Sequence, residues 1–346
     1  MDNFDPFLRD WSAQKTINGK NFDEIFQIEG TPLWWFYRRL FVAHVTPQPL
    51  NFFQEIDENK KAPFRKKMWA SFYASCMGRY LLWNEKRKIR FFLSRQKKQL
   101  PKDGEKDAAL LFLTYSTHLL PDGNIFRLQN MFNAVKNEEK IRSFVLFADP
   151  LSSRQYRKLK TQPTIYEYFD ENCHAKASAH AQRLFQSWCS ITDNEKQNLL
   201  TMENSVTLWP YLQYQFKAVF SQEFLYLTAL NYEICKKIIE QENVKAIVVT
   251  SQSGFFEKCL LAAAFLKKVP VFQVQHGMGT GGLDTTYPTK RLVFSDYHKQ
   301  ELIKTGVDEK DISVTGPIVF DDVSKHITTN LIRERIILRS RSFERS

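Results

Sequence analysis

The stretch Lys245–Gly282, KAIVVTSQSGFFEKCLLAAAFLKKVPVFQVQHGMGTGG, decides the fold of this chain. Lys245–Thr250 is a short β-branched run typical of a buried parallel strand, and the serines and glycine after it are residues that begin helices. Phe255–Lys268 is then predicted to be a crossover helix, and Val269–Val274 the next parallel strand. The stretch therefore predicts a βαβ unit that runs into a glycine-rich loop, at the edge where open α/β sheets bind ligands.

The same alternation extends in both directions and predicts an α/β fold with one Rossmann-like parallel sheet. We expect this domain to span residues 105–322, after a helical, basic region at 1–104 and before an arginine-rich tail at 323–346. Residues 171–240 are predicted to be mostly helical, and TIYEYF at 164–169 a strand. The remaining predicted elements are strands at Ala108–Tyr115, Ser143–Phe147, Arg291–Ser295 and Asp311–Thr315, and helices at Ile125–Lys136 and His298–Thr305.

Composition excludes several classes of protein. At 346 residues, with 43% hydrophobic and 25% charged residues, the chain has the composition of a globular protein. Its five cysteines occur singly, which argues against a disulfide framework and a zinc site, and we predict buried thiols and no metal. The sequence lacks a signal peptide and any apolar run of roughly 18 residues, so we expect a cytoplasmic protein.

An aromatic helix is predicted near the amino terminus. Thr31 suits an N-cap and Pro32 the first helical position. Apolar residues follow at helical spacing, which favours a face packed on the core over a membrane or partner face. These residues are Leu33, Phe36, Tyr37, Leu40 and Phe41.

Positive charge is concentrated in Lys60–Lys98, which holds thirteen Lys and Arg against the single acid Glu85, a net charge of +12 in a chain of net charge +11. Aromatic and apolar residues alternate with the basic clusters, which is typical of a helix at an anionic membrane surface. A solvated basic face on a buried helix is the alternative. Nucleic-acid binding is disfavoured, because the segment matches no recognition module and the rest of the chain is about neutral.

The loop after Val274 is the first candidate for a site. Gly277, Gly279 and Gly282 match a dinucleotide-binding spacing, but LDTTYPTK follows in place of a helix, so we predict no such cofactor. Two readings remain: a loop whose backbone amides approach a phosphate closely, or a tight surface turn.

His276 lies just after a strand end and beside glycine, where its pKa range suits removal of a proton from an acceptor hydroxyl. The other histidines are assigned structural roles by default, with His118 as the exception because it follows the first strand of the same sheet. We predict that His276 is catalytic and that substrate contacts come from neighbouring loops. The predicted substrate-binding residues are Gln275, Gly277, Gly279, His118, Ser251 and Ser253.

VQHGMGTG and the later LVFSDYHKQELIKTGVDEKDISVTGPIVFDD resemble the GT-B glycosyltransferase group that includes CDP-glycerol glycerophosphotransferases and the capsule and polysialic-acid transferases. The resemblance covers roughly Ala108–Asp322, and its motifs are short. It implies that His276 corresponds to the catalytic histidine of the acceptor-side half. It also implies transfer of a sugar or polyol phosphate from a nucleotide-activated donor to a glycan or lipid-linked acceptor in surface polysaccharide biosynthesis.

The family's donor-binding domain would begin about where the arginine-rich tail starts, so the sequence resembles the acceptor half of such an enzyme. A truncated product, a separate donor-binding partner and a non-catalytic scaffold at the inner membrane face are all open. A nucleotide-sugar 2-epimerase is the alternative enzyme, since it shares the architecture. Donor, acceptor and oligomeric state are not determined by the sequence.

Overall fold

The computed structural model describes residues 12–37, 83, 87, 107–120, 124–125, 128–136, 142–148, 165–201, 207, 209–252, 254–275, 287, 289–304 and 306–317. These residues form two compact units, each built from separate parts of the chain. Unit 1 takes described residues from 1–105, 164–241 and 253–267, and unit 2 takes them from 106–163, 242–252 and 268–346. The boundaries predicted at 104/105 and 322/323 stay predictions.

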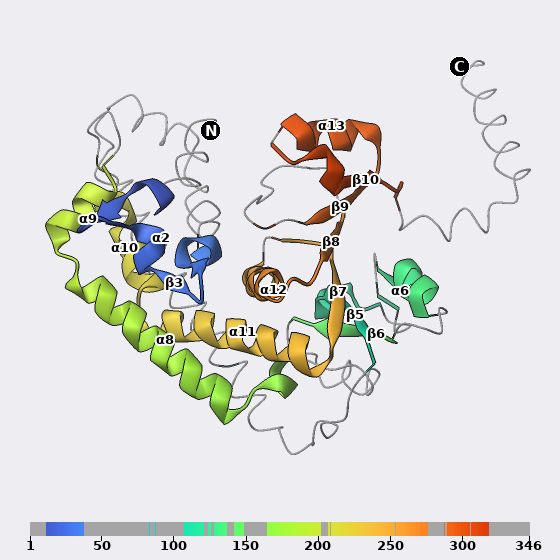
Figure 1. The fold of residues 1–346 in the computed structure, drawn as a ribbon, viewed down its shortest axis with the longest axis horizontal. Coiled ribbons are helices and arrows are strands. Elements are labelled where there is room, and N and C mark those ends of the chain that lie inside the picture. The colour runs from blue at the N-terminus through green and yellow to red at the C-terminus, as the bar shows by residue number, and fades with distance from the viewer. Residues whose placement is uncertain are drawn as a thin grey trace, which may run out of the picture. The chain divides into compact units, whose positions relative to one another are not determined.

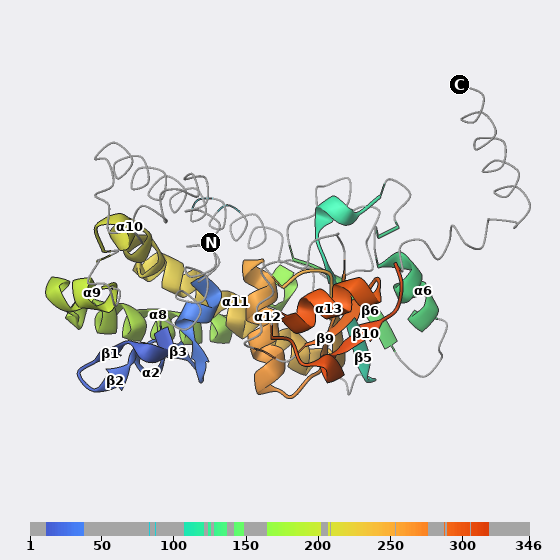
Figure 2. The same ribbon diagram turned by 90° about the horizontal axis from the view of Figure 1, so that it is seen from above.

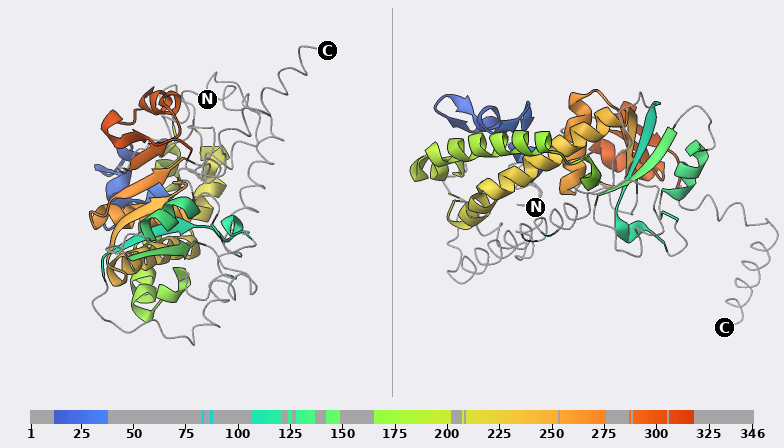
Figure 3. Two further views of the ribbon diagram at one scale, coloured as in Figure 1. Left: turned by 90° about the vertical axis from the view of Figure 1, so that its right-hand side faces the viewer. Right: turned by 90° about the horizontal axis from the view of Figure 1, so that it is seen from below.

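Unit 2 contains a six-stranded, all-parallel sheet, which confirms the predicted α/β fold with a Rossmann-like domain (Figure 1). The strand order is β10-β9-β8-β7-β5-β6. The strands are β5 (Ala109–Thr114), β6 (Arg142–Phe147), β7 (Val244–Val249), β8 (Val271–Val274), β9 (Lys290–Val293) and β10 (Ile312–Val314), and they lie side by side in Figure 3.

The chain adds its strands first on one side of β5 and then on the other, so the order of the strands in the sheet has one switch point. From β5 the chain goes to β6 on one side, and then to β7 on the other side of β5. The strands β8, β9 and β10 continue outward from β7. The switch point is therefore between β5 and β7, and the crevice at the carboxyl ends of two such strands is where doubly wound sheets bind ligands.

Helix α6 (Gln129–Lys136) covers one face of this sheet through a hydrophobic core. Leu128 and Phe132 pack with Phe112 and with strand residues of β6, β7 and β8. The rings of Phe112 and Phe132 meet edge to face, with centroids 5.4 Å apart. At the other end of the sheet, α13 (Asp296–Lys304) packs on β9 and β10 through Leu302, and the short η3 (Glu309–Asp311) leads into β10.

Unit 1 is mainly helical, as predicted for residues 171–240 (Figure 2). Its longest helices, α8 (Glu171–Ser190) and α11 (Gln222–Gln241), pack against each other. The described residues of unit 1 also form the helices α2 (Phe22–Ile25), α9 (Asp193–Leu199), α10 (Trp209–Val219) and α12 (Phe255–Leu266).

Two small hairpins belong to unit 1. Strands β1 (Thr16–Ile17) and β2 (Lys20–Asn21) are joined by Asn18-Gly19, and β3 (Gln27–Ile28) and β4 (Thr31–Pro32) by Glu29-Gly30. All four turn residues have positive φ, the geometry of the tight turns that match strand twist.

The second hairpin corrects the predicted helix start. Thr31 and Pro32 are the strand β4 instead of the N-cap and first turn, because the Glu29-Gly30 turn pairs Thr31 with Ile28. Helical residues follow from Leu33 to Tyr37. Leu33, Phe36 and Tyr37 are buried, which confirms the core face for these residues, whereas Leu40 and Phe41 lie outside the described residues.

Two other predictions were wrong. The predicted strand at 164–169 contains instead the 3-10 turn η2 (Ile165–Tyr168). Ile165 and Tyr168 are both buried and three residues apart, so one turn of 3-10 helix places both inward, which an alternating strand does not. Among the cysteines, Cys173, Cys235 and Cys259 are buried as expected, but Cys189 is exposed.

Candidate functional site

The candidate site lies at the carboxyl ends of β5, β7 and β8 in unit 2. Of the predicted site residues, His118 follows β5, Ser251 follows β7 and Gln275 follows β8. Because parallel strands end at the same edge of a sheet, these three residues belong to one edge. The predicted residues Ser253, His276, Gly277 and Gly279 lie outside the described residues.

The end of β5 positions His118 through a short turn. The 3-10 turn η1 (Ser116–His118) follows the strand, and the amide of His118 donates to the carbonyl oxygen of Tyr115 at 2.9 Å. The Thr114 hydroxyl, which is buried, lies 3.2 Å from Nδ1 of His118. This contact fixes the ring orientation of a half-buried imidazole at the switch point, as proton transfer requires.

Gln275 extends the contact between β8 and β9. Its amide donates to the Leu292 carbonyl at 2.9 Å, and its side-chain Oε1 accepts from the amide of Phe294 at 2.8 Å. The side-chain oxygen therefore anchors the chain at the point where the glycine-rich loop begins. A contact between Gln275 and substrate stays a prediction.

Gln252 is a polar residue of this edge that the sequence analysis missed. It follows Ser251 after β7, and only 5% of its surface is exposed. Its Nε2 and Oε1 have no hydrogen-bond partner within the described part of the chain. The flanking serines are typical of helix starts. The signal that could have identified Gln252 is its position three residues after a buried strand, where a polar side chain lies at the edge of the sheet that binds ligands.

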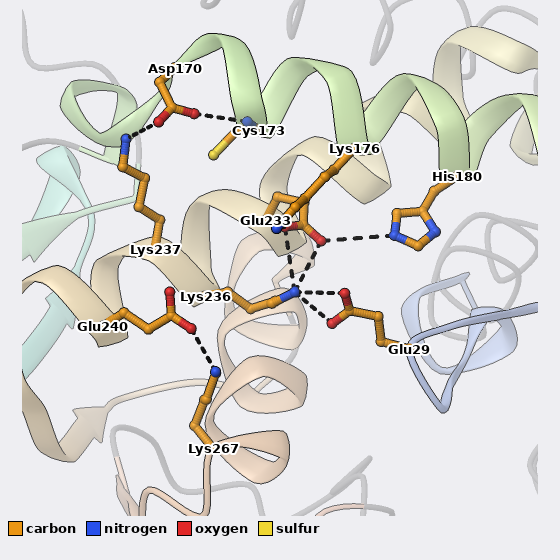
Figure 4. Close-up of polar contacts among 10 residues, drawn as sticks. All are labelled: Glu29, Asp170, Cys173, Lys176, His180, Glu233, Lys236, Lys237, Glu240 and Lys267. Carbon is orange, nitrogen blue, oxygen red and sulfur yellow. Dashed lines mark hydrogen bonds and ion pairs between the residues drawn. The ribbon is translucent and has the colours of Figure 1, made fainter.

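A different cluster in unit 1 has the residue types of a metal site. Ligand atoms of Glu29, His180 and Glu233 lie within 4.8 Å of one another. The ammonium of Lys236, however, lies 2.6 Å from a carboxylate oxygen of Glu29 and 3.3 Å from one of Glu233. Figure 4 shows Lys236 between these two carboxylates. Because a cation of the protein itself already pairs with both carboxylates, we interpret the cluster as an ion-pair network that holds the β3–β4 turn to α11.

The pKa values in this network follow from burial and charge. Burial alone lowers the pKa of Lys236, but its hydrogen bonds to Glu29 and the charge of Glu233 outweigh burial and raise it. Burial lowers the pKa of His180, and the Glu233 carboxylate, 3.9 Å away, opposes that shift only in part. The network thus favours a charged lysine and a neutral histidine.

The basic segment Lys60–Lys98 lies outside the described residues except for Trp83 and Arg87, both helical. Trp83 is 56% exposed, and the Arg87 guanidinium lies 5.2 Å from the centroid of its ring. In the described ranges, every helix is too short or too polar to cross a bilayer.

Comparison with solved structures finds a distant likeness. The crystal structure of the UDP-GlcNAc 2-epimerase from Neisseria meningitidis bound to UDP-GlcNAc aligns with 66% of this chain, at 14% identity and a TM-score of 0.33. The alignment covers 52% of the epimerase, so the chain spans about half of its length. No family model and no curated protein matches the sequence. No residue role transfers from the epimerase at this level of similarity.

Proposed function

We propose that this chain is the acceptor-binding part of a transferase that moves a sugar or polyol phosphate from a nucleotide-activated donor to a surface glycan or a lipid-linked acceptor. The observation that supports this most is the shared edge of His118, Gln252 and Gln275 in a doubly wound sheet. His276, the residue after Gln275, is the proposed base.

In the proposed reaction, His276 accepts the proton of an acceptor hydroxyl while the acceptor oxygen bonds to the transferred group. The bond between that group and the nucleotide breaks, and the nucleotide leaves with the electron pair. A positioned base of this kind contributes about 100-fold to 10,000-fold to the rate. His118, held by Thr114, is proposed to bind the acceptor beside it.

The donor is proposed to bind to a separate domain or partner subunit, as the resemblance to the GT-B transferases implies. The basic segment Lys60–Lys98 is proposed to hold the protein on the inner face of the membrane, where lipid-linked acceptors are found. Binding to the membrane would place the acceptor-binding part close to a lipid-linked acceptor.

The test is a transfer assay with CDP-, UDP- and CMP-activated donors, with and without a donor-binding domain from a homologue. We expect transfer that falls about 100-fold or more in His276→Ala, with little change in melting temperature. The matched control is His174→Ala, which removes a histidine of unit 1 that contacts the Tyr226 hydroxyl at 2.8 Å. His276→Ala with most of its activity retained would rule out the proposed base.

A further inference from the structure

The side-chain amide of Gln252 is a buried polar group without a hydrogen-bond partner among the residues that the structure describes. Only 5% of the residue is exposed, and within the described residues neither Nε2 nor Oε1 has a hydrogen-bond partner. Most buried polar side-chain atoms in proteins have a partner, because leaving one unpaired is costly. A buried side chain without such a partner, at the edge where a sheet binds ligands, can form its hydrogen bonds with a bound ligand.

The position of Gln252 in the sheet identifies where that partner would lie. Leu113 of β5 and Val249 of β7 are the last register partners between these strands. Gln252 comes three residues after Val249, and the Thr114–His118 pair follows Leu113. Both groups therefore belong to the switch point between β5 and β7, where doubly wound sheets bind ligands.

The charge of this edge indicates what kind of ligand fits. The described residues that follow β5, β7 and β8 include no Asp, Glu, Lys or Arg; they are Tyr115–Leu120, Thr250–Gln252 and Gln275. A phosphate would gain no cationic partner from these side chains, and as an acceptor it would leave the Oε1 of Gln252 unpaired. A hydroxyl both donates and accepts, so two neighbouring hydroxyls satisfy both ends of a carboxamide.

We propose that Gln252 hydrogen-bonds the neutral, hydroxyl-bearing part of the ligand, a sugar ring or polyol, in the crevice between the carboxyl ends of β5 and β7. The inference rests on the proposed function, whose substrates contain such a part, and it assigns Gln252 as a specificity-determining residue. The charged part of the ligand lies elsewhere.

The first test needs no substrate. Gln252→Met keeps the shape of the side chain and removes the unpaired amide, so the melting temperature should rise by about 2 to 4 °C. The matched control is Gln273→Met on β8, because the Gln273 Oε1 accepts from the buried Arg291 at 2.9 Å. This control should melt at a lower temperature than the wild type. A lower melting temperature for Gln252→Met would show that its amide has a structural partner and would overturn the proposal.

The second test observes the Gln252 side-chain amide by NMR, with its signal identified by its loss in Gln252→Met. Titration with methyl α-glucoside or glycerol should shift this signal, and titration with inorganic phosphate should not. A signal that responds to phosphate, or to none of the three probes, would refute the proposal. Because neither test requires turnover, a failure of the transferase assay and a failure of this assignment are separate results.

Discussion

At the scale of single residues, the polar groups of this chain divide into paired and unpaired ones. Glu233, with only 4% of its side chain exposed, is surrounded by Lys236, Lys176 and His180. Gln252 is equally buried and lacks such partners within the described chain. The first arrangement stabilises the fold, whereas the second costs stability, as is common where a protein binds a ligand.

Lys236→Met should destabilise the protein by about 3 kcal/mol, because it leaves the buried Glu233 carboxylate without its nearest cation. The matched control is Lys304→Met, since Lys304 also pairs with a glutamate three residues earlier but has 72% of its side chain exposed. Exposed ion pairs contribute little, so the control should unfold like the wild type. Urea unfolding measures the free energy of unfolding of both variants. Equal losses in Lys236→Met and Lys304→Met would contradict a stabilising network.

His180 should make stability depend on pH. Its folded pKa lies below the ordinary value of 6.5 because burial favours the neutral ring, with Glu233 and Glu29 opposing and Arg183 and Lys236 adding to the shift. The unfolded chain therefore binds the proton first, so the contribution is present above pH 6.5 and is lost as the pH falls. Between pH 7.5 and about pH 5.5, the free energy of unfolding should fall less for His180→Gln than for the wild type. Equal losses would exclude this role.

At the scale of elements, the sequence predicted the buried strands within one or two residues but misplaced short elements. β5, β7 and β8 are short, mainly apolar runs, and β7 and β8 are also rich in β-branched residues, which is typical of buried parallel strands. The β3–β4 hairpin was missed because its strands are two residues long, and its turn is specified by positive φ at Glu29 and Gly30.

The same contrast holds at the candidate site. The sequence placed His118 and Gln275 just after buried strands, and the structure has them there, whereas their contact with substrate stays a prediction. It did not show that the Gln275 side-chain oxygen accepts from the Phe294 amide, or that the Gln252 side chain has no hydrogen-bond partner within the described ranges. Such pairings depend on contacts between strands far apart in the sequence, which periodicity does not reveal.

Helix α8 depends on the cap supplied by Asp170. Its carboxylate accepts from the amide of Cys173 at 2.8 Å and also pairs with Lys237. Asp170→Ala should therefore lower stability by about 1 kcal/mol. Asp193→Ala is the control, because this first-turn aspartate of α9 is 91% exposed and does not cap its helix. If both variants melt at the same temperature, the cap contributes nothing measurable.

At the scale of the whole molecule, the chain contains a parallel-sheet unit with a candidate ligand edge, a helical unit and a basic segment. The segment Lys60–Lys98 is predicted to bind anionic vesicles through its charge of +12. Co-sedimentation should show binding to vesicles with phosphatidylserine. Binding should be weaker in 0.5 M salt, because salt in this range shortens the screening length of exposed charges to about 3 to 10 Å. Equal binding to neutral vesicles would contradict the electrostatic part.

Hydrogen–deuterium exchange tests whether the carboxyl edge of the unit 2 sheet binds the ligand. Exchange is compared with and without the donors and glycan acceptors of the transfer assay. We expect protection that is concentrated in the segments after β5, β7 and β8, which contain His118, Gln252 and Gln275. Protection concentrated instead on α8 and α11, with these three segments unchanged, would contradict it.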